Sequence, residues 1–130
     1  MINKTNLDIG PFLFQKGKVG CLLIHGFLGT PYEMRGLGEY LAERDITALG
    51  VRLAGHATTV DDMHRTNWRD WWASALEGYR QLRGMCDPVF VCGLSMGGAF
   101  VLHLAAHYPE IKGVLAIAPA VRLENPLLLL

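Results

Sequence analysis

Residues 89–98 read VFVCGLSMGG, and this stretch decides the fold. Its first four residues form a short apolar run, which is typical of a strand buried on both faces. The next five residues fit the pattern G-x-S-x-G with Ser95 at the centre, and helix-forming residues follow over 96–107. A strand, a glycine-flanked turn and a helix in this order predict that the Ser95 hydroxyl projects above a sheet from a sharp turn.

The glycines around Ser95 have a physical reason in such a turn. The serine backbone is strained there, and side chains two residues to either side would collide with neighbouring backbone. Gly98 would let the helix pack close to the strand, and the N-terminus of that helix directs positive dipole at a developing oxyanion. The alternative, a serine N-cap with glycines nearby by chance, explains fewer of these features.

Strand and helix patterns alternate along the rest of the chain. Thr30 and Glu33 form a predicted capping box with Pro31 at the first helical position, and Thr66 is a candidate N-cap. The tryptophan-rich helix that would follow Thr66 is interpreted as carrying an apolar core stripe. Strands are expected at residues 12–14, 19–24, 46–51, 88–92 and 113–118, helices at about 30–44, 66–84 and 96–107, and a loop at 52–62.

Strands that are separated by crossover helices predict a parallel sheet. The expected fold class is therefore α/β, with a partial, doubly wound, mostly parallel sheet and helices on both of its faces. Residues 12–14 are expected to add a short antiparallel strand.

The loop after the 19–24 strand is the second candidate element of the site. In a doubly wound sheet this loop lies at the carboxyl edge of the strands, on the same side as Ser95. An oxyanion hole needs two backbone N–H donors, and Met96, the residue after the serine, would supply one. Phe27 is the candidate for the other. His25 could act as a base there, but a role in bracing the loop is favoured.

Composition excludes several classes of function. Lys plus Arg equals Asp plus Glu, at 12 each, so no net charge attracts nucleic acid or an anionic membrane. No apolar run is long enough to cross a bilayer, and the first ten residues lack a secretory signal. The three cysteines are interpreted as buried free thiols in a cytoplasmic protein, because their spacing does not suit a structural zinc site. We expect no metal and no cofactor.

The chain also resembles a known family, over about residues 10–119. The resemblance rests on residues 20–34, 52–56, 61–63, 68–71 and 89–98, and its specific markers are HGFLGTP at 25–31 and GLSMGG at 93–98. These stretches are similar to bacterial carboxylesterases related to monoacylglycerol lipases, within the α/β-hydrolase superfamily. The resemblance implies hydrolysis of short to medium acyl esters or monoacylglycerols without cofactor or metal. It implies Ser95 as nucleophile and Phe27 and Met96 as oxyanion donors.

A general base and an orienting acid are missing from the sequence. In this fold they follow the nucleophile in the order acid, then histidine. After Ser95 the acids are Glu110 and Glu124, and the histidines, His103 and His107, precede both. His103 would lie about 12 Å from Ser95 along the helix, beyond hydrogen-bond reach. We therefore expect residues 1–130 to be the N-terminal portion of one α/β-hydrolase domain: a truncated product, a fragment or half of a split enzyme.

Two alternatives stay open at this point. Another serine enzyme of the same fold, such as an acyltransferase, a cofactor-free haloperoxidase or a C–C bond hydrolase, would share the serine turn. A non-catalytic remnant would explain the missing base and acid. On either interpretation we expect the isolated chain to have little esterase activity and poor solubility, because the 113–118 strand would leave an apolar edge.

Overall fold

A computed structural model describes residues 8–122. Within these residues, five strands and four helices follow one another. In order they are β1 (Phe12–Phe14), β2 (Gly20–Ile24), α1 (Tyr32–Ala42), β3 (Thr47–Val51), α2 (Val60–His64), α3 (Trp68–Arg83), β4 (Val89–Leu94), α4 (Met96–His107) and β5 (Gly113–Ile117).

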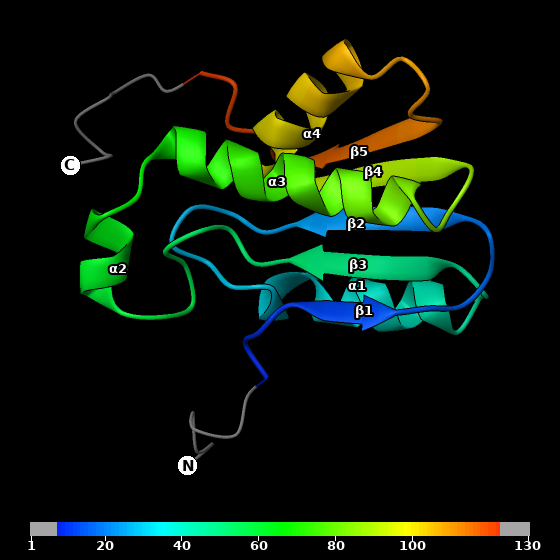
Figure 1. Cartoon of the computed structure of the whole chain (residues 1–130), viewed down its shortest axis with the longest axis horizontal. Helices are drawn as coiled ribbons and strands as arrows, with labels where there is room; N and C mark the ends of the chain where they lie inside the picture. The colour runs from blue at the N-terminus through cyan, green and yellow to red at the C-terminus, as the bar shows by residue number, and fades with distance from the viewer. Residues whose placement is uncertain (1–7, 123–130) are drawn as a thin grey trace.

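The strands form one sheet in the order β1-β3-β2-β4-β5. β1 pairs antiparallel with β3, and the other three pairings are parallel, with Ile24 opposite Val51 on one side and Gly93 on the other. Figure 1 shows α3 and α4 on one face of the sheet and α1 on the opposite face, in agreement with the contacts of these helices. This confirms the predicted α/β fold with a partial, doubly wound sheet, including the antiparallel strand at 12–14.

Each face of the sheet has its own core. Alternate residues of β2 point to opposite faces. Leu22 and Ile24 therefore join the larger core under α3 and α4, with Tyr79 and Leu82 among its members. Leu23 lies in the smaller core under α1. β2 is apolar throughout because both of its faces are buried, as is usual in a parallel sheet, whereas Phe90 of β4 is 37% exposed.

Local capping differs from the sequence-based expectations in three places. The predicted N-cap of α3, Thr66, is wrong: Asn67 caps that helix, with Asp70 completing a reciprocal capping box. The predicted loop at 52–62 contains the start of α2, which has its own capping box from Thr59 and Asp62. The predicted capping box of α1 is half formed: the Thr30 hydroxyl accepts a hydrogen bond from the Tyr32 N–H at 3.2 Å, but among the described residues the Glu33 side chain makes no return bond to Thr30.

The tryptophans of α3 also differ from one another. Trp71 and Trp72 pack partly buried against the larger core, but Trp68 is 56% exposed, so it is not part of the core stripe. All three cysteines are free and buried, as predicted. Within residues 8–122, none of the helices is both long and apolar enough for a transmembrane span.

β5 forms an open edge of the sheet, as the sequence predicted. Val114, Leu115 and Ile117 are exposed by 40%, 54% and 39%. Between this strand and α1 the sheet face is uncovered, and an apolar hollow of about 420 Å³ lies there, lined among others by Leu37, Phe90 and Leu115.

Candidate active site

Ser95 lies on a sharp turn between β4 and α4. Its backbone has φ 56° and ψ −114°, a conformation that residues other than glycine rarely adopt. Three hydrogen bonds hold it: its N–H donates to the Ile117 carbonyl at 2.9 Å, and its own carbonyl accepts from Ala99 and Ala120 at 3.2 and 3.0 Å. Its side chain is partly exposed. The chain thus maintains a strained serine at the carboxyl edge of the parallel strands.

The glycines of the motif are required by close backbone contacts. A Cβ on Gly93 would overlap the carbonyl of Gly97, and a Cβ on Gly97 would overlap the carbonyl of Ile24. The turn therefore brings β4, the first turn of α4 and the end of β2 into direct contact, and a side chain at either position would force them apart. This is the collision that the sequence motif predicted.

The loop after β2 lies against this turn. A Cβ built on Gly26 would lie 3.5 Å from the Ser95 Cβ and 3.4 Å from the Leu94 carbonyl oxygen. Among the hydrogen bonds of the described residues, none uses the backbone N–H of Phe27 or of Met96 as donor. In the described part of the chain both amides are therefore without a protein acceptor.

His25 braces the two loops at this edge. Its ring is fully buried, with Nδ1 2.8 Å from the Gly26 carbonyl oxygen and Nε2 accepting from the Leu53 N–H at 3.1 Å. A carbonyl can only accept, so Nδ1 carries the proton and the ring is neutral. Burial lowers the pKa of His25 to about 4. With both nitrogens occupied, His25 is not available as a base for Ser95.

A second buried histidine, His56, lies close to Phe27. The sequence alone did not predict a structural role for this residue. Its Nδ1 is 3.0 Å from the Ala54 carbonyl oxygen, and its Nε2 has no hydrogen-bond partner among the described residues. Its ring centroid lies 5.4 Å from that of Trp71 and 6.2 Å from that of Phe27. Burial lowers the pKa of His56. The ring therefore acts as a neutral aromatic support for the loop that carries Phe27.

Among residues 8–122, no histidine or carboxylate is hydrogen-bonded to the Ser95 side chain. Glu110 instead accepts a hydrogen bond from the Tyr79 hydroxyl at 3.0 Å, and burial together with this carboxylate raises the pKa of Tyr79 to about 12. Glu124 lies outside the described residues.

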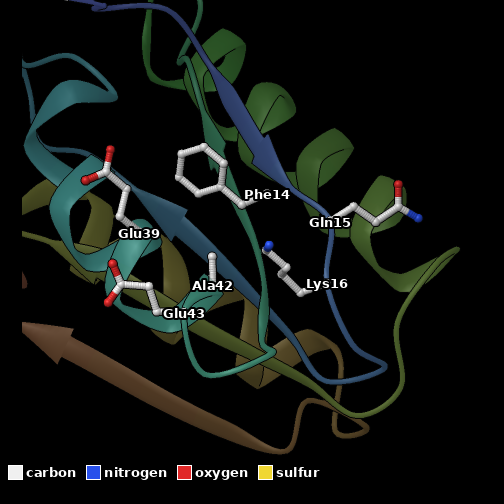
Figure 2. Close-up of a pocket in the computed structure, with 6 residues that line it drawn as sticks. All are labelled: Phe14, Gln15, Lys16, Glu39, Ala42 and Glu43. Atoms are coloured by element: carbon white, nitrogen blue, oxygen red, sulfur yellow. The ribbon is translucent and has the colours of Figure 1, made fainter.

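One further hollow lies away from the serine turn. It has a volume of about 470 Å³ and lies between β1 and α1, and Figure 2 shows Lys16, Glu39 and Glu43 among the residues that line it. Phe14, which lines it, pairs with Ala48 near the start of β3, so this hollow lies toward the opposite end of the sheet from Ser95. Across residues 8–122, no group of three or more His, Cys, Asp or Glu side chains is arranged to hold a metal ion.

Comparison with known proteins agrees with this geometry. The chain is 50% identical over 111 residues to the thermostable monoacylglycerol lipase of Bacillus sp. (strain H-257), covering 85% of this chain and 44% of that protein. It is 34% identical over 116 residues to a carboxylesterase of Bacillus subtilis (strain 168), covering 88% and 47%. The chain therefore spans about half the length of the curated relatives that it matches.

Solved structures give the same result. A structure reported for the metagenome-derived lipolytic enzymes LipS and LipT superposes with a TM-score of 0.89 at 38% identity, covering 93% of this chain and 50% of that one. The monoacylglycerol lipase of Paleococcus ferrophilus shares the fold, with a TM-score of 0.68 at 20% identity, and the chain covers 45% of it. The model of one hydrolase family, described as serine aminopeptidase S33, matches residues 15–129. The chain belongs to this family of α/β-hydrolases.

Proposed function

We propose that this chain provides the nucleophile and the oxyanion hole of a serine hydrolase that acts on carboxylic esters. The observation that carries the proposal is the Ser95 backbone: a non-glycine residue at φ 56° on the turn between β4 and α4. Strain of about 1–3 kcal/mol at one residue persists only where the surrounding structure enforces it, and such residues cluster at reactive sites.

The proposed reaction proceeds through an acyl-enzyme. The Ser95 Oγ attacks the ester carbonyl carbon, and its proton passes to a histidine base. Negative charge then develops on the carbonyl oxygen, where the Phe27 and Met96 N–H groups and the N-terminus of α4 would stabilise it. The bond to the alcohol breaks, and the alcohol leaves with the proton from the histidine. Water, activated by the same histidine, then hydrolyses the acyl-serine.

The histidine base and its acid belong, on this proposal, to the part of the relatives that this chain does not match. Residues 1–130 would form the N-terminal portion of one α/β-hydrolase domain, completed by a continuing chain or by a separate polypeptide. The carboxyl edge of the sheet supports this arrangement, because Ser95 is partly exposed there and its hydroxyl has no partner among the described residues.

Ester substrates are favoured over peptides. The description of the family names an aminopeptidase, but both curated relatives are named for lipase or carboxylesterase activity. Around the serine turn, Phe27 is 38% exposed and Leu28 67% exposed, which suits an apolar acyl chain. We infer short to medium acyl esters or monoacylglycerols as substrates, with no nucleic-acid partner. The buried free thiols suit a reducing, cytoplasmic setting.

A chimera tests this function. Residues 1–122 of this chain would be joined to the part of the Bacillus sp. H-257 lipase that this chain does not match, and hydrolysis of p-nitrophenyl butyrate and of a monoacylglycerol would be measured. We expect turnover by the chimera, and little or none by the 130-residue chain alone. Ser95→Ala should lower kcat on the order of 10⁴-fold or more.

The matched control is Ser74→Ala in the same chimera. Ser74 accepts a hydrogen bond from the Ala54 N–H and donates one to the Asp70 carbonyl, so it has a structural role. This variant should retain turnover and labelling by a fluorophosphonate probe, whereas Ser95→Ala should lose both. A chimera with native-like circular dichroism that neither turns over ester nor reacts with the probe would disprove the proposal.

A further inference from the structure

Two histidines on α4 form an exposed pair, separate from the serine turn. His103 and His107 are four residues apart, so they lie on the same face of the helix. Their ring centroids are 4.3 Å apart, and both residues are exposed. We propose that these two imidazoles chelate a divalent transition-metal ion of the Ni²⁺, Cu²⁺ or Zn²⁺ type on the outer face of α4.

One hydrogen bond fixes the tautomer and orientation of the His107 ring. Its Nδ1 lies 2.9 Å from the carbonyl oxygen of His103. Because that oxygen can only accept, Nδ1 of the neutral ring carries the proton, and the lone pair lies on Nε2. Metal-ligating histidines usually donate their second ring N–H to a carbonyl or carboxylate in this way, which fixes both tautomer and ring orientation.

An aromatic contact with Trp72 of α3 restricts the orientation of the His103 ring. Its ring lies edge-on to Trp72, with centroids 4.5 Å apart and planes at 73°. Trp72 also lies 6.4 Å from the His107 ring and 6.0 Å from Phe100. In the described residues neither ring nitrogen of His103 has a hydrogen-bond partner. The contact with Trp72 therefore restricts the His103 ring while leaving its nitrogens available, which lowers the entropy cost of chelation.

The chemistry of the pair selects the class of metal. Neutral imidazole suits nickel, copper and zinc rather than magnesium or calcium. Since no cluster of three ligating side chains occurs in residues 8–122, water would complete the coordination shell. A two-ligand site of this kind does not use Ser95, and it is independent of the proposed ester hydrolysis. For one N-donor site the affinity should rise from Zn²⁺ and Ni²⁺ to Cu²⁺.

A nickel titration of the 130-residue chain tests the proposal. Binding of NiCl₂ would be followed by calorimetry and by tryptophan fluorescence, since Trp72 touches both rings. We expect one ion per chain, and His103→Ala or His107→Ala should each weaken binding about tenfold or more. Trp72→Phe should retain the affinity and lose most of the fluorescence response. Because both histidines are exposed, circular dichroism should show unchanged folding.

Two control variants distinguish the effect of the i, i+4 spacing of the histidines from the effect of their number. The double variant His103→Ala, Leu102→His keeps two histidines on α4 but places them five residues apart, about 140° around the helix, and it should bind as weakly as the single variants. His64→Ala removes an exposed histidine from α2 and should leave binding unchanged. Equal affinity in the wild type and in His107→Ala, or in the double variant, would show that the pair only packs against Trp72. A nickel-dependent rise of Tm in wild type, absent in His107→Gln, gives a second measurement.

Discussion

Most of the described non-glycine residues with positive φ lie at the carboxyl edge of the sheet, and Asp45, before β3, is the exception. Ser95 has positive φ, and so do Leu28 in the loop after β2 and Ala57 in the loop after β3. These loops meet at the carboxyl edge of the sheet, where His25 joins them through its bonds to Gly26 and Leu53. Local conformations that cost energy are therefore tolerated because buried polar contacts fix the loops around them.

The buried His25 ring predicts a loss of stability in mild acid. The unfolded ring binds a proton below its ordinary pKa of 6.5, whereas the folded ring resists protonation down to about 4. Its contribution is therefore complete above pH 6.5 and is lost as the pH falls toward 4. Between pH 7 and pH 5 the free energy of unfolding should fall by about 2 kcal/mol from this residue alone. Urea unfolding at the two pH values measures it.

The comparison with His25→Gln isolates this effect. The variant should be less stable at pH 7, because it loses the bond from Leu53, but its stability should change less between pH 7 and pH 5. His64→Gln, at an exposed position of α2, is the matched control for the loss of one imidazole. If His25→Gln kept the full pH dependence of the wild type, the titration would not belong to His25.

Residues within motifs could be predicted from the sequence, and residues in irregular loops could not. The strained turn at Ser95 follows from its glycines, whose collisions are local and depend on a few neighbouring atoms. The burial of His56 depends on where a long loop folds back onto Phe27 and Trp71. The helix and strand periodicities of the sequence do not predict contacts of this kind between a loop and distant residues. The roles of Ser95, Phe27 and Met96 remain predictions, since they concern a substrate.

At the scale of elements, periodicity located the helices better than capping residues did. The α4 limits agree with the prediction, and α3 ends at Arg83, next to the expected Gly84. The N-terminal cap of α3 was misplaced because Thr66 and Asn67 are both good caps. Thr66 instead accepts a hydrogen bond from the Trp71 indole at 2.9 Å and donates to the Met63 carbonyl. Tertiary contacts decide between adjacent candidates that local propensity cannot separate.

Two helical glycines should respond in opposite directions to alanine. Gly36 in α1 is exposed, and a Cβ there would meet no atom within 4 Å. Gly36→Ala should therefore stabilise the chain by about 0.5–1 kcal/mol. A Cβ on Gly78 in α3 would overlap Cγ1 of Val51 and lie 3.2 Å from Cδ1 of Leu22. Gly78→Ala should cost about 1–3 kcal/mol, because α3 must move away from the sheet.

Urea denaturation of the two variants at neutral pH measures both effects. The pair controls for helix propensity, since each substitution gives the same gain in an α-helix and only the packing differs. A stabilising Gly78→Ala would mean that α3 does not approach β2 and β3 as closely as the structure has it.

At the scale of the whole molecule, the sheet order could be predicted in outline. Short apolar runs that alternate with helices leave few topologies, because crossovers between parallel strands are right-handed and helices must cover both faces. The same requirement for helices on both faces predicts that β5 should be covered, because its residues are apolar. The described helices leave the face beside β5 uncovered.

The open face beside β5 should make the isolated chain self-associate. Phe90 and Leu115 form an apolar surface next to the edge of β5, and such edges pair with other chains. We expect concentration-dependent association in sedimentation velocity, together with strong binding of the dye ANS. Leu115→Lys places a charge on this strand and should reduce both. Val60→Lys is the matched control, because Val60 is 72% exposed on α2 and adds the same charge elsewhere. If both lysine variants reduced association equally, the added charge, and not the loss of the β5 surface, would explain the reduction. If the wild-type chain stayed monomeric at high concentration, the β5 surface would not mediate self-association.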